Sequence, residues 1–570
     1  MIADVTVRNE VYSLRAALKR ATWSYQKDDL ASALDECVSI LVISPDFAEA
    51  RHLKGIIHYR RHEYSEAIQS LEAAIAMDPD NASYYVNLGN AHQESSNLEA
   101  AIHCYEKAIR LAPNMADAYF NLGNAFYKKS DFKNALQSYD TALCLQPSNS
   151  SVLSNRALVL LALGERARAL KDLKTATRVD PFDPGVGLNY GVALEQHGNW
   201  EQALVEYERV IELDQRLPKV FYNKGKVLAE LGRPSEAIDS FDRALTINPG
   251  YEKAAVSKGL LLLQLGRFRE GFELYEHRWQ ISEAGVSRRA FSQALWLGQN
   301  SIAGKSILLH AEQGLGDTIQ FCRYAARVQA LGARVILEVQ PTLVPLMQTL
   351  PGVDQLIAHG DKLPNFDFHC PLMSLPLAFG TTVETIPCEV PYLNADSRLV
   401  DRWRSYIGKN GFKIAVAWQG NHKNKLDIGR SFPLEFLRDL AHVEGVRLIS
   451  IQKGFGSDQL SSLPSGAAVE ILPDHFDESE GAFQDTAAIM KCVDLVITSD
   501  TSLTHLAGAL AIKTWLPLKL SPDWRWMTER PDTPWYPNHR LFRQSSIGDW
   551  SSAFRQMESA IRNCYRQTVI

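Results

Sequence analysis

Three polar loops in the C-terminal half of the chain each follow a short apolar run and precede a helical stretch. The first loop reads Gly314-Leu315-Gly316-Asp317 and comes after the apolar run 306–310. A glycine-rich turn of this kind presents backbone N–H groups at a helix N-terminus, where anions bind. It lacks the third glycine of the dinucleotide-binding fingerprint. Asp317 together with Gln320 also fits a helix-capping box, so a purely structural role stays open.

The second loop, 419–431, is flanked by glycines and carries several cations. Gly420 opens it, Lys423, Lys425 and Arg430 supply positive charge, and Pro433 follows at a position that favours the first turn of a helix. Cations between a strand and a helix are suited to binding phosphate. A solvated charged loop is the alternative.

The third loop joins the apolar run 494–498 to a helix of small residues. It contains Asp500, Thr501 and Ser502, residue types that cap helices, and His505 lies about one turn further on. Open α/β sheets bind ligands at the carboxyl ends of their strands, where the free N–H groups of such a helix form an anion site. We therefore expect His505 to contact a ligand, although a lone histidine on a helix is usually structural.

The order of strands and helices around these loops predicts a parallel α/β fold. The expected strands are 306–310, 334–339, 413–418, 447–451 and 494–498, and Gln452 follows the fourth of them. Small residues after 501 would let the last helix approach the sheet. Two Rossmann-like lobes are expected, over 305–410 and 411–570, and the second includes a C-terminal helix.

The N-terminal half repeats itself every 34 residues. Glycine or alanine stands at one phase, alanine at a second, proline at a third, and an aromatic residue or leucine at a fourth. Because proline inside a helix costs about 3 kcal/mol, a phased proline marks a helix end. The unit 82–115 then reads as two helices, 83–95 and 98–111. A glycine within a helix needs a packing reason, and we expect close approach to the second helix at its phased alanine.

This pattern resembles the tetratricopeptide repeat. We expect an N-terminal extension over 1–13, an all-α repeat superhelix over 14–285 of about eight units with a degenerate first unit, and a connecting segment over 286–304.

A row of asparagines stands two residues before the phased glycine. Two residues turn a helix by about 200°, so this row faces away from the partner helix. Either it hydrogen-bonds an extended polypeptide in the groove of the superhelix, or it links neighbouring repeats. A similar row holds peptide in the protein O-GlcNAc transferases. The row comprises Asn87, Asn121, Asn155, Asn189 and Asn223.

Composition narrows the class of protein. Among the 570 residues, 46% are hydrophobic and 22% charged, and the net charge of −6 offers no argument for binding nucleic acid or membrane. The chain shows neither a secretory signal nor an apolar stretch of membrane-spanning length. The eight cysteines are scattered without a CxxC pair, which is typical of reduced thiols. A cytoplasmic location is expected.

The three loops, in this order and spacing, resemble the heptosyltransferase-like glycosyltransferases of GT-B fold. The run Asp523-Trp524-Arg525-Trp526 matches the bacterial members that also carry tetratricopeptide repeats. The resemblance covers about 48–550 and implies an inverting, metal-independent sugar transfer without a cofactor, from a nucleotide-sugar substrate. The one DxD sequence, at 78–80, ends a repeat helix.

The resemblance also implies roles for single residues. Asp317 becomes the general base, with Gly314 and Gly316 in its loop. Lys425 or Arg430 neutralises phosphate, and the sequence does not choose between them. The remaining donor-binding residues are Gly420, Gln452, Asp500, Thr501, Ser502 and His505.

The repeats set this chain apart from simple heptosyltransferases, because a lipid-sugar acceptor does not require them. A protein acceptor held by the repeats is therefore expected, by analogy with O-GlcNAc transferase and with flagellin-modifying enzymes. Two alternatives stay open: a cell-envelope or polysaccharide transferase, and a non-catalytic tetratricopeptide scaffold. The sequence names neither the sugar, the nucleotide, the acceptor nor the oligomeric state.

Overall fold

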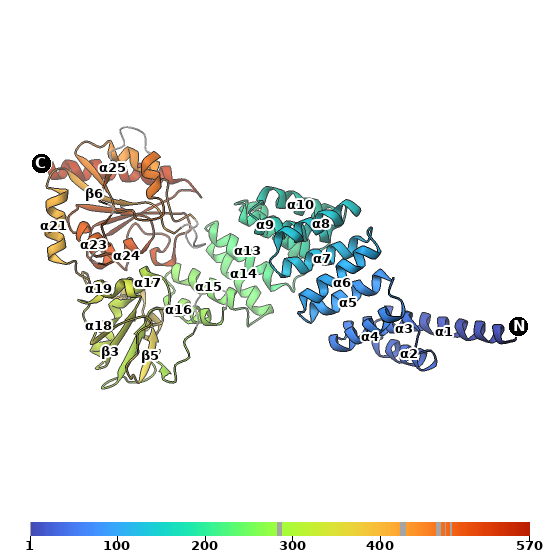
Figure 1. Cartoon of the computed structure of the whole chain (residues 1–570). Coiled ribbons are helices and arrows are strands. Elements are labelled where there is room, and N and C mark those ends of the chain that lie inside the picture. The colour runs from blue at the N-terminus through green and yellow to red at the C-terminus, as the bar shows by residue number, and fades with distance from the viewer. Residues whose placement is uncertain are drawn as a thin grey trace. The chain divides into compact units, whose positions relative to one another are not determined.

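The structure is a computed structural model. It describes residues 2–281, 288–421, 429–462, 469–473, 475–478 and 481–569. The chain divides into two compact units, residues 1–215 and 216–570. The first unit is helical, and the second contains further helices and two parallel sheets (Figure 1).

Unit 1 is a series of antiparallel helix pairs. The pair predicted at 83–95 and 98–111 forms as α5 (Ala82–Glu94) and α6 (Leu98–Leu111), so the repeat phase located its helices to within one residue. The other helices are α1 (Ile2–Gln26), α2 (Leu30–Ile43), α3 (Ala48–Arg60), α4 (Tyr64–Met77), α7 (Ala116–Lys128), α8 (Phe132–Leu145), α9 (Ser150–Ala162), α10 (Arg166–Val179), α11 (Pro184–Gln196) and α12 (Trp200–Leu213).

The phased glycine approaches the second helix of its pair, as expected, but its contact differs between repeats. At Gly55 and Gly259 the alanine-phase carbonyls, of Ala67 and Gly271, are among the nearest atoms, whereas in four other repeats an aromatic ring is nearest. A Cβ atom at Gly123 would lie 2.5 Å from a ring carbon of Tyr139, and one at Gly89 would lie 2.5 Å from a ring carbon of Tyr105. Glycine is needed there because a buried ring fills the space of its missing side chain. Leucine stands at the aromatic phase in two repeats, as Leu173 after Ala157 and as Leu71 after Gly55.

Unit 2 begins with two more helix pairs of the same period. These are α13 (Pro218–Glu230), α14 (Pro234–Ile247), α15 (Glu252–Gln264) and α16 (Phe268–Tyr275), followed by a 3-10 turn, η1 (Glu276–Gln280). Phe272 of α16 packs edge-on against Trp524, with ring centroids 5.6 Å apart. The last repeat therefore shares one apolar core with the α/β part of the unit.

The first sheet has five parallel strands in the order β1-β5-β2-β3-β4. Its strands β2 (Ser306–His310) and β3 (Arg334–Val339) lie where the sequence predicted them, while β1 (Ala294–Leu295) comes from the segment expected to be a connection. Strands β4 (Gln355–Ala358) and β5 (Phe368–Pro371) complete the sheet. Its helices are α17 (Leu315–Phe321), α18 (Ala325–Ala330), α19 (Val344–Met347) and α20 (Leu375–Ala378).

The second sheet has six parallel strands in the order β11-β10-β9-β6-β7-β8. Parallel pairing buries both faces of its central strands, which explains the continuous apolar runs in the sequence. Its strands are β6 (Phe412–Ala417), β7 (Val446–Ser450), β8 (Val469–Ile471), β9 (Leu495–Thr498), β10 (Thr514–Leu518) and β11 (His539–Arg543). Its helices are α22 (Leu437–Ala441), α23 (Gln484–Met490), α24 (Ser502–Ala509) and α25 (Trp550–Val569).

Helix α21 (Ser397–Ile407) follows the first sheet in sequence but packs beside α23 of the second. The indole N–H of Trp403 on α21 donates to Asp485 Oδ1 on α23, at 2.6 Å. The predicted fold class is confirmed: a tetratricopeptide-repeat superhelix precedes an α/β region of two parallel sheets. Helices α17 and α24, one from each lobe, pack on one another (Figure 1).

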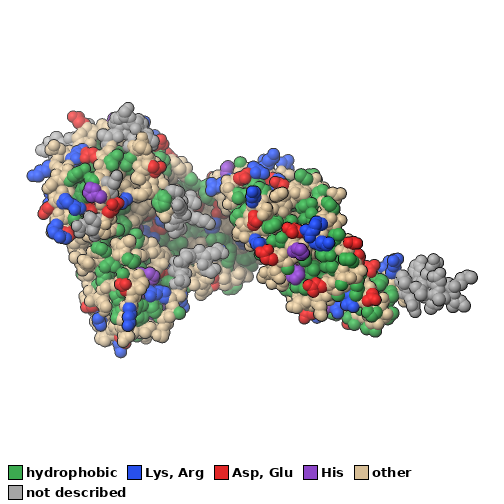
Figure 2. All heavy atoms as spheres, viewed as in Figure 1, with side chains coloured by type: hydrophobic (Ala, Val, Ile, Leu, Met, Phe, Trp, Pro, Cys, Tyr) green, Lys and Arg blue, Asp and Glu red, His purple; other side chains and the backbone are tan. Residues whose placement is uncertain are grey.

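Acidic and basic side chains intermingle on the visible face of the molecule (Figure 2). This distribution agrees with the modest net charge of −6. In the described part of the chain, no helix is both long and apolar enough to cross a membrane.

Candidate functional site

The candidate base Asp317 lies in the first turn of α17 and has both carboxylate oxygens engaged. Its Oδ2 accepts a hydrogen bond from the backbone N–H of Gly314 at 2.9 Å, which is the capping contact that the sequence allowed. Its Oδ1 accepts from Nη2 of Arg525 at 2.5 Å. Capping accounts for one oxygen only, and the second belongs to a contact between the lobes.

Arg525 lies in a 3-10 turn, η10 (Trp524–Trp526), of the second lobe and is 6% exposed. Its guanidinium donates through each of its three nitrogens to a different side chain. The partners are Asp317, the Oε1 of Gln320 at 2.5 Å, and the Oδ1 of Asp523 at 2.9 Å. The planar fork of arginine suits such multiple contacts.

The charged chain continues into the loop that follows β6. Nη2 of Arg430 donates to Asp523 Oδ2 at 2.8 Å, and its Nε lies 3.6 Å from Asp500 Oδ2. Asp317, Arg525, Asp523, Arg430 and Asp500 thus alternate in sign from one lobe to the other. We call these five residues the interlobe chain. Its three carboxylates and two guanidiniums leave a formal charge of −1 when all are ionised.

Burial and charge pull the pKa values of this chain in different directions. Burial raises the pKa of Asp317, and the Arg525 guanidinium opposes that rise. Burial likewise raises the pKa of Asp500, opposed by Arg430. The two guanidiniums outweigh burial at Asp523 and lower its pKa. A carboxyl group with a raised pKa is suited to accept a proton near neutral pH.

Helix α24 approaches the glycine loop closely at Gly316. A Cβ atom at Gly316 would lie 2.8 Å from Cδ2 of His505 and 3.3 Å from the Cα of Ser502. The first turns of α17 and α24 therefore pack against each other. Further along α24, Gly508 lies against the ring of Tyr536, so the absence of a side chain at this position leaves room for that ring.

His505 contacts the side chains of Tyr536 and Trp526. Its Nδ1 lies 3.0 Å from the hydroxyl of Tyr536, and its ring stacks on Trp526 with centroids 5.6 Å apart. Burial lowers the pKa of His505 well below its usual 6.5, so the imidazole is neutral at neutral pH. A neutral imidazole can donate or accept a hydrogen bond but carries no charge toward a phosphate.

Thr501 and Ser502 begin α24 as expected from the sequence. Thr501 is the N-cap residue, and its hydroxyl donates to the carbonyl of Ser499 at 3.3 Å rather than capping the helix. The buried hydroxyl of Ser499 lacks a hydrogen-bond partner among the described residues. No side chain among the described residues caps the N-terminus of α24, while the N–H of Thr504 donates to the carbonyl of Thr501 at 3.1 Å.

The side-chain amide of Gln452 hydrogen-bonds to backbone groups, three of them at the start of the loop after β6. Its Oε1 accepts from the backbone N–H of Trp418 at 2.9 Å and of Gln419 at 3.0 Å. Its Nε2 donates to the carbonyls of Gln419 and Phe455. This arrangement makes Gln452 a brace for the loop, which the sequence did not indicate.

The rest of that loop is described in part. The backbone N–H of Gly420 donates to the hydroxyl of Ser431 at 3.1 Å, which ties the two ends of the loop together. Lys425, the other candidate for neutralising phosphate, lies outside the described residues. Arg430 is described and belongs to the interlobe chain.

The last repeat positions the glycine loop from the opposite side. Gln313 donates to the hydroxyl of Tyr275 at 2.7 Å. Arg278 is almost fully buried and pairs with Glu312 at 3.0 Å. The carbonyl of Pro522 accepts from Gln264 at 2.8 Å. The end of the repeat array is thus bonded to segments of both lobes beside the interlobe chain.

The asparagine row lies within the repeats and is nowhere fully exposed. Its members reach side chains about one repeat earlier, which is the inter-repeat alternative. Asn121 is half-buried, and Asn223 is buried with its Nδ2 unpaired among the described residues. The pairs are Asn87 Nδ2 with His52 Nε2 at 2.7 Å, Asn155 Nδ2 with Asn124 Oδ1 at 2.8 Å, and Asn189 Nδ2 with Ser154 Oγ at 3.0 Å.

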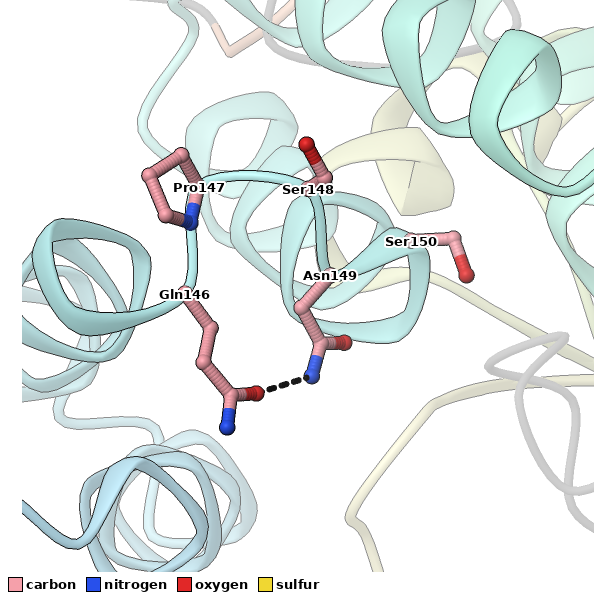
Figure 3. A pocket seen from close by; sticks show the side chains of 5 residues that line it. All are labelled: Gln146, Pro147, Ser148, Asn149 and Ser150. Carbon is pink, nitrogen blue, oxygen red and sulfur yellow. Dashed lines mark hydrogen bonds between the residues drawn. The ribbon is translucent and has the colours of Figure 1, made fainter.

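A surface hollow of about 500 Å³ lies at the turn between α8 and α9 in unit 1 (Figure 3). It is lined by the short segment 146–150, in which Asn149 donates to Gln146 at 3.1 Å. These side chains bond to each other and cap α9, so we assign the hollow to turn structure. Across the described residues, no three His, Cys, Asp or Glu side chains gather as metal ligands do.

Two participants of the site were not assigned a role from the sequence. Asp523 and Arg525 form the centre of the interlobe chain, yet in sequence they are only charged residues between tryptophans. The available signal was the resemblance of the run 523–526 to bacterial relatives. Its chemical meaning depends on a contact between residues 208 positions apart.

Comparison with protein families finds tetratricopeptide repeats in both units. Models described as tetratricopeptide or TPR repeat match residues 55–96, 86–150, 191–232 and 218–251. The chain therefore carries tetratricopeptide repeats, as predicted.

Among characterised proteins, the chain is similar to Protein FlbA of Caulobacter vibrioides. The two are 26% identical over 312 residues, which cover 51% of this chain and 52% of FlbA. The chain thus spans about half the length of this relative.

The chain is also similar to solved structures. One is YrrB, described as a TPR protein with an unusual peptide-binding site, at 28% identity, a TM-score of 0.30, and coverage of 34% of this chain and all of YrrB. Another is PilF of Pseudomonas aeruginosa, at 20% identity, a TM-score of 0.34, and coverage of 36% of this chain and 94% of PilF.

Proposed function

We propose that the protein transfers a sugar from a nucleotide-sugar donor to a protein acceptor held by its tetratricopeptide repeats. One observation carries the proposal. A carboxylate from one α/β lobe, Asp317, belongs to the same interlobe chain as the Arg430 guanidinium of the other lobe, and its loop packs against the N-terminal turn of α24. This is the combination that glycosyl transfer to a hydroxyl group needs: a base for the acceptor and positive groups for the leaving diphosphate.

In the proposed reaction the acceptor oxygen attacks the anomeric carbon of the donor sugar. The bond from that carbon to the diphosphate oxygen breaks, and the nucleoside diphosphate leaves with the electron pair. Asp317 takes the proton of the acceptor hydroxyl. Burial supports this role by raising the pKa of Asp317.

The donor diphosphate is proposed to bind at the N-terminus of α24. Ser502 begins this helix after the N-cap residue Thr501, no described side chain caps it, and a helix N-terminus favours an anion. Arg430 is the described cation nearest to Asp500. His505 is proposed to hydrogen-bond the sugar or phosphate from its neutral imidazole.

The proposal of a protein acceptor comes from the repeats. Tetratricopeptide repeats are protein-binding modules, and here the last of them is bonded to both α/β lobes. A transferase for lipid or glycan acceptors would not need such an array. We propose that the asparagine row contributes to acceptor binding in addition to its bonds between repeats, since each amide has more than one hydrogen-bonding group.

The test has two stages. Calorimetry of the full chain with UDP, GDP, ADP and CMP first asks whether a nucleotide binds. In the second stage, the Asp317→Asn variant is used to capture an acceptor protein. The captured protein is then incubated with wild-type enzyme and with a nucleotide-sugar that contains the nucleotide found to bind. A mass increase of one sugar residue on the captured protein supports the proposal. If the wild type binds none of these nucleotides, the non-catalytic scaffold is favoured instead.

A further inference from the structure

The centre of the interlobe chain is a buried arginine with no part in the chemistry described above. Arg525 is 6% exposed, and its guanidinium spans from Asp317 in the first lobe to Asp523 in the second. Burying a cation is costly unless its hydrogen bonds and charge are matched. Here both requirements are met by two carboxylates and an amide. So costly an arrangement at the candidate base calls for a role.

We propose that Arg525 is a positioning residue, which fixes the orientation and the charge state of the candidate base Asp317. The proposal rests on the proposed function for its catalytic meaning. It assigns to Arg525 no contact with the donor or the acceptor.

The geometry explains how orientation is fixed. Gly314 donates to one carboxylate oxygen of Asp317 and Arg525 donates to the other, at 2.9 Å and 2.5 Å. Two anchors on different oxygens prevent rotation of the carboxylate. Each oxygen keeps a further lone pair, so the base remains able to accept a proton.

Arginine is required for this contact because its nitrogens point in three directions. Nε bonds Gln320, Nη1 bonds Asp523 and Nη2 bonds Asp317. A lysine ammonium in the same place would keep the charge but could not span these partners. The substitution Arg525→Lys therefore keeps the positive charge beside Asp317 while removing the three-way hydrogen bonding that orients its carboxylate.

The charge state of the base follows from the groups around it. Arg525 and Arg430 favour the carboxylate, whereas burial and Asp523 favour the protonated acid. Tyr275, from the last repeat, and His505, against the neighbouring Gly316, also face this region, and both are neutral near neutral pH. Removing the Arg525 charge thus moves the pKa of Asp317 further upward.

The experiment compares the wild type with Arg525→Gln, Arg525→Lys and a matched control, Arg323→Lys. Arg323 is equally buried at the junction of the lobes, but it donates to backbone carbonyls and to Tyr392. The measured quantity is the pH dependence of kcat for sugar transfer. We expect Arg525→Gln to shift the acidic limb to higher pH by about one unit.

Arg525→Lys is expected to keep the limb near its wild-type position while lowering kcat by about tenfold or more, because charge remains and orientation is lost. Arg323→Lys should lower the melting temperature without moving the limb. The proposal is overturned if the limb of Arg525→Gln coincides with that of the wild type, or if Arg323→Lys shifts it equally.

A second readout separates this proposal from the proposed function. An aspartate whose folded pKa is raised loses stability as pH rises through the interval between its unfolded and folded pKa values. Asp317→Asn removes that loss. The melting-temperature gain from Asp317→Asn between pH 4 and pH 7 should therefore be larger in the Arg525→Gln background than in the wild type. Equal melting-temperature gains in the two backgrounds would overturn the positioning role of Arg525, whether or not sugar transfer is found. A larger gain in the Arg525→Gln background without any sugar transfer would reject the proposed function but not the positioning role.

Discussion

The guanidinium of Arg525 donates to the carboxylate of Asp317 across the junction of the two α/β lobes, at 2.5 Å. One residue belongs to the first turn of α17 and the other to the 3-10 turn η10 of the second lobe. Their contact links Asp317, through Arg525 and Asp523, to Arg430 and Asp500. It gives the lobes a shared polar centre in addition to their apolar core.

Replacing Asp317 with asparagine tests the base. The amide cannot take up the acceptor proton at neutral pH, so kcat is expected to fall by about 10²–10⁴-fold. Affinity for the nucleoside diphosphate should stay within a few-fold of the wild type. Transfer kinetics and calorimetry measure the two quantities. Wild-type kcat in Asp317→Asn would remove this residue from the mechanism.

The pH profile tests the environment of Asp317. Because burial raises its pKa above the ordinary value of 3.8, the carboxylate is protonated at a higher pH than a solvent-exposed aspartate. Transfer should therefore decline as pH falls, with the acidic limb above that ordinary value. The limb is read from kcat between pH 4 and pH 9. A profile flat down to pH 4 would contradict the assignment.

Gly316 tests the close approach of α17 and α24. An alanine there would bring its Cβ to 2.8 Å from the ring of His505. We expect Gly316→Ala to lower the free energy of unfolding by about 1–3 kcal/mol. The control is Gly250→Ala, whose Cβ would find its nearest neighbour at 3.6 Å. Equal thermal stability of both variants would argue against the packing described here.

The glycine of the repeats has its own test. A Cβ atom at position 123 would meet the ring of Tyr139, so Gly123→Ala alone should destabilise unit 1. Adding Tyr139→Leu reproduces the pair that the chain already uses at Ala157 and Leu173. The double variant should then lose less stability than the sum of the single variants. Simple additivity in chemical unfolding would show that the ring and the glycine are not coupled.

The asparagine row bonds neighbouring repeats and is proposed to bind the acceptor, and one experiment can separate the two. Replacing Asn121, Asn155 and Asn189 with alanine should weaken acceptor capture without changing nucleotide affinity. Because Asn155 and Asn189 also bond neighbouring repeats, the same variant should melt earlier. Lower stability with unchanged acceptor affinity would assign the row to repeat packing alone.

Periodic and local features were predictable from the sequence. Helices α5 and α6 and strands β2 and β3 lie within one residue of their expected bounds, because phased prolines and short apolar runs act locally. The approach of the phased glycine to the second helix was predicted, but its contact with an aromatic ring in four repeats was not. Its ring is 16 residues away, on the next helix, and helix periodicity alone does not rank such partners.

The site itself depends on contacts that the sequence does not encode locally. Asp317 and Arg525 are 208 positions apart, and only the fold brings them together. Gln452 follows a strand, as a ligand-binding residue often does, yet its amide braces the neighbouring loop. The positions of the three loops between strands and helices were therefore predictable from the sequence, whereas the hydrogen-bond partners of their side chains were not.

The central claim is sugar transfer to a protein, and intact-mass spectrometry tests it most directly. Protein captured from cells by the full-length Asp317→Asn variant is incubated with wild-type enzyme and nucleotide-sugar donors, and its mass is measured. We expect an increase of one or more sugar residues with the wild type and none with Asp317→Asn as the added enzyme. An unchanged mass with every donor, together with no nucleoside diphosphate binding by the wild type, would contradict it.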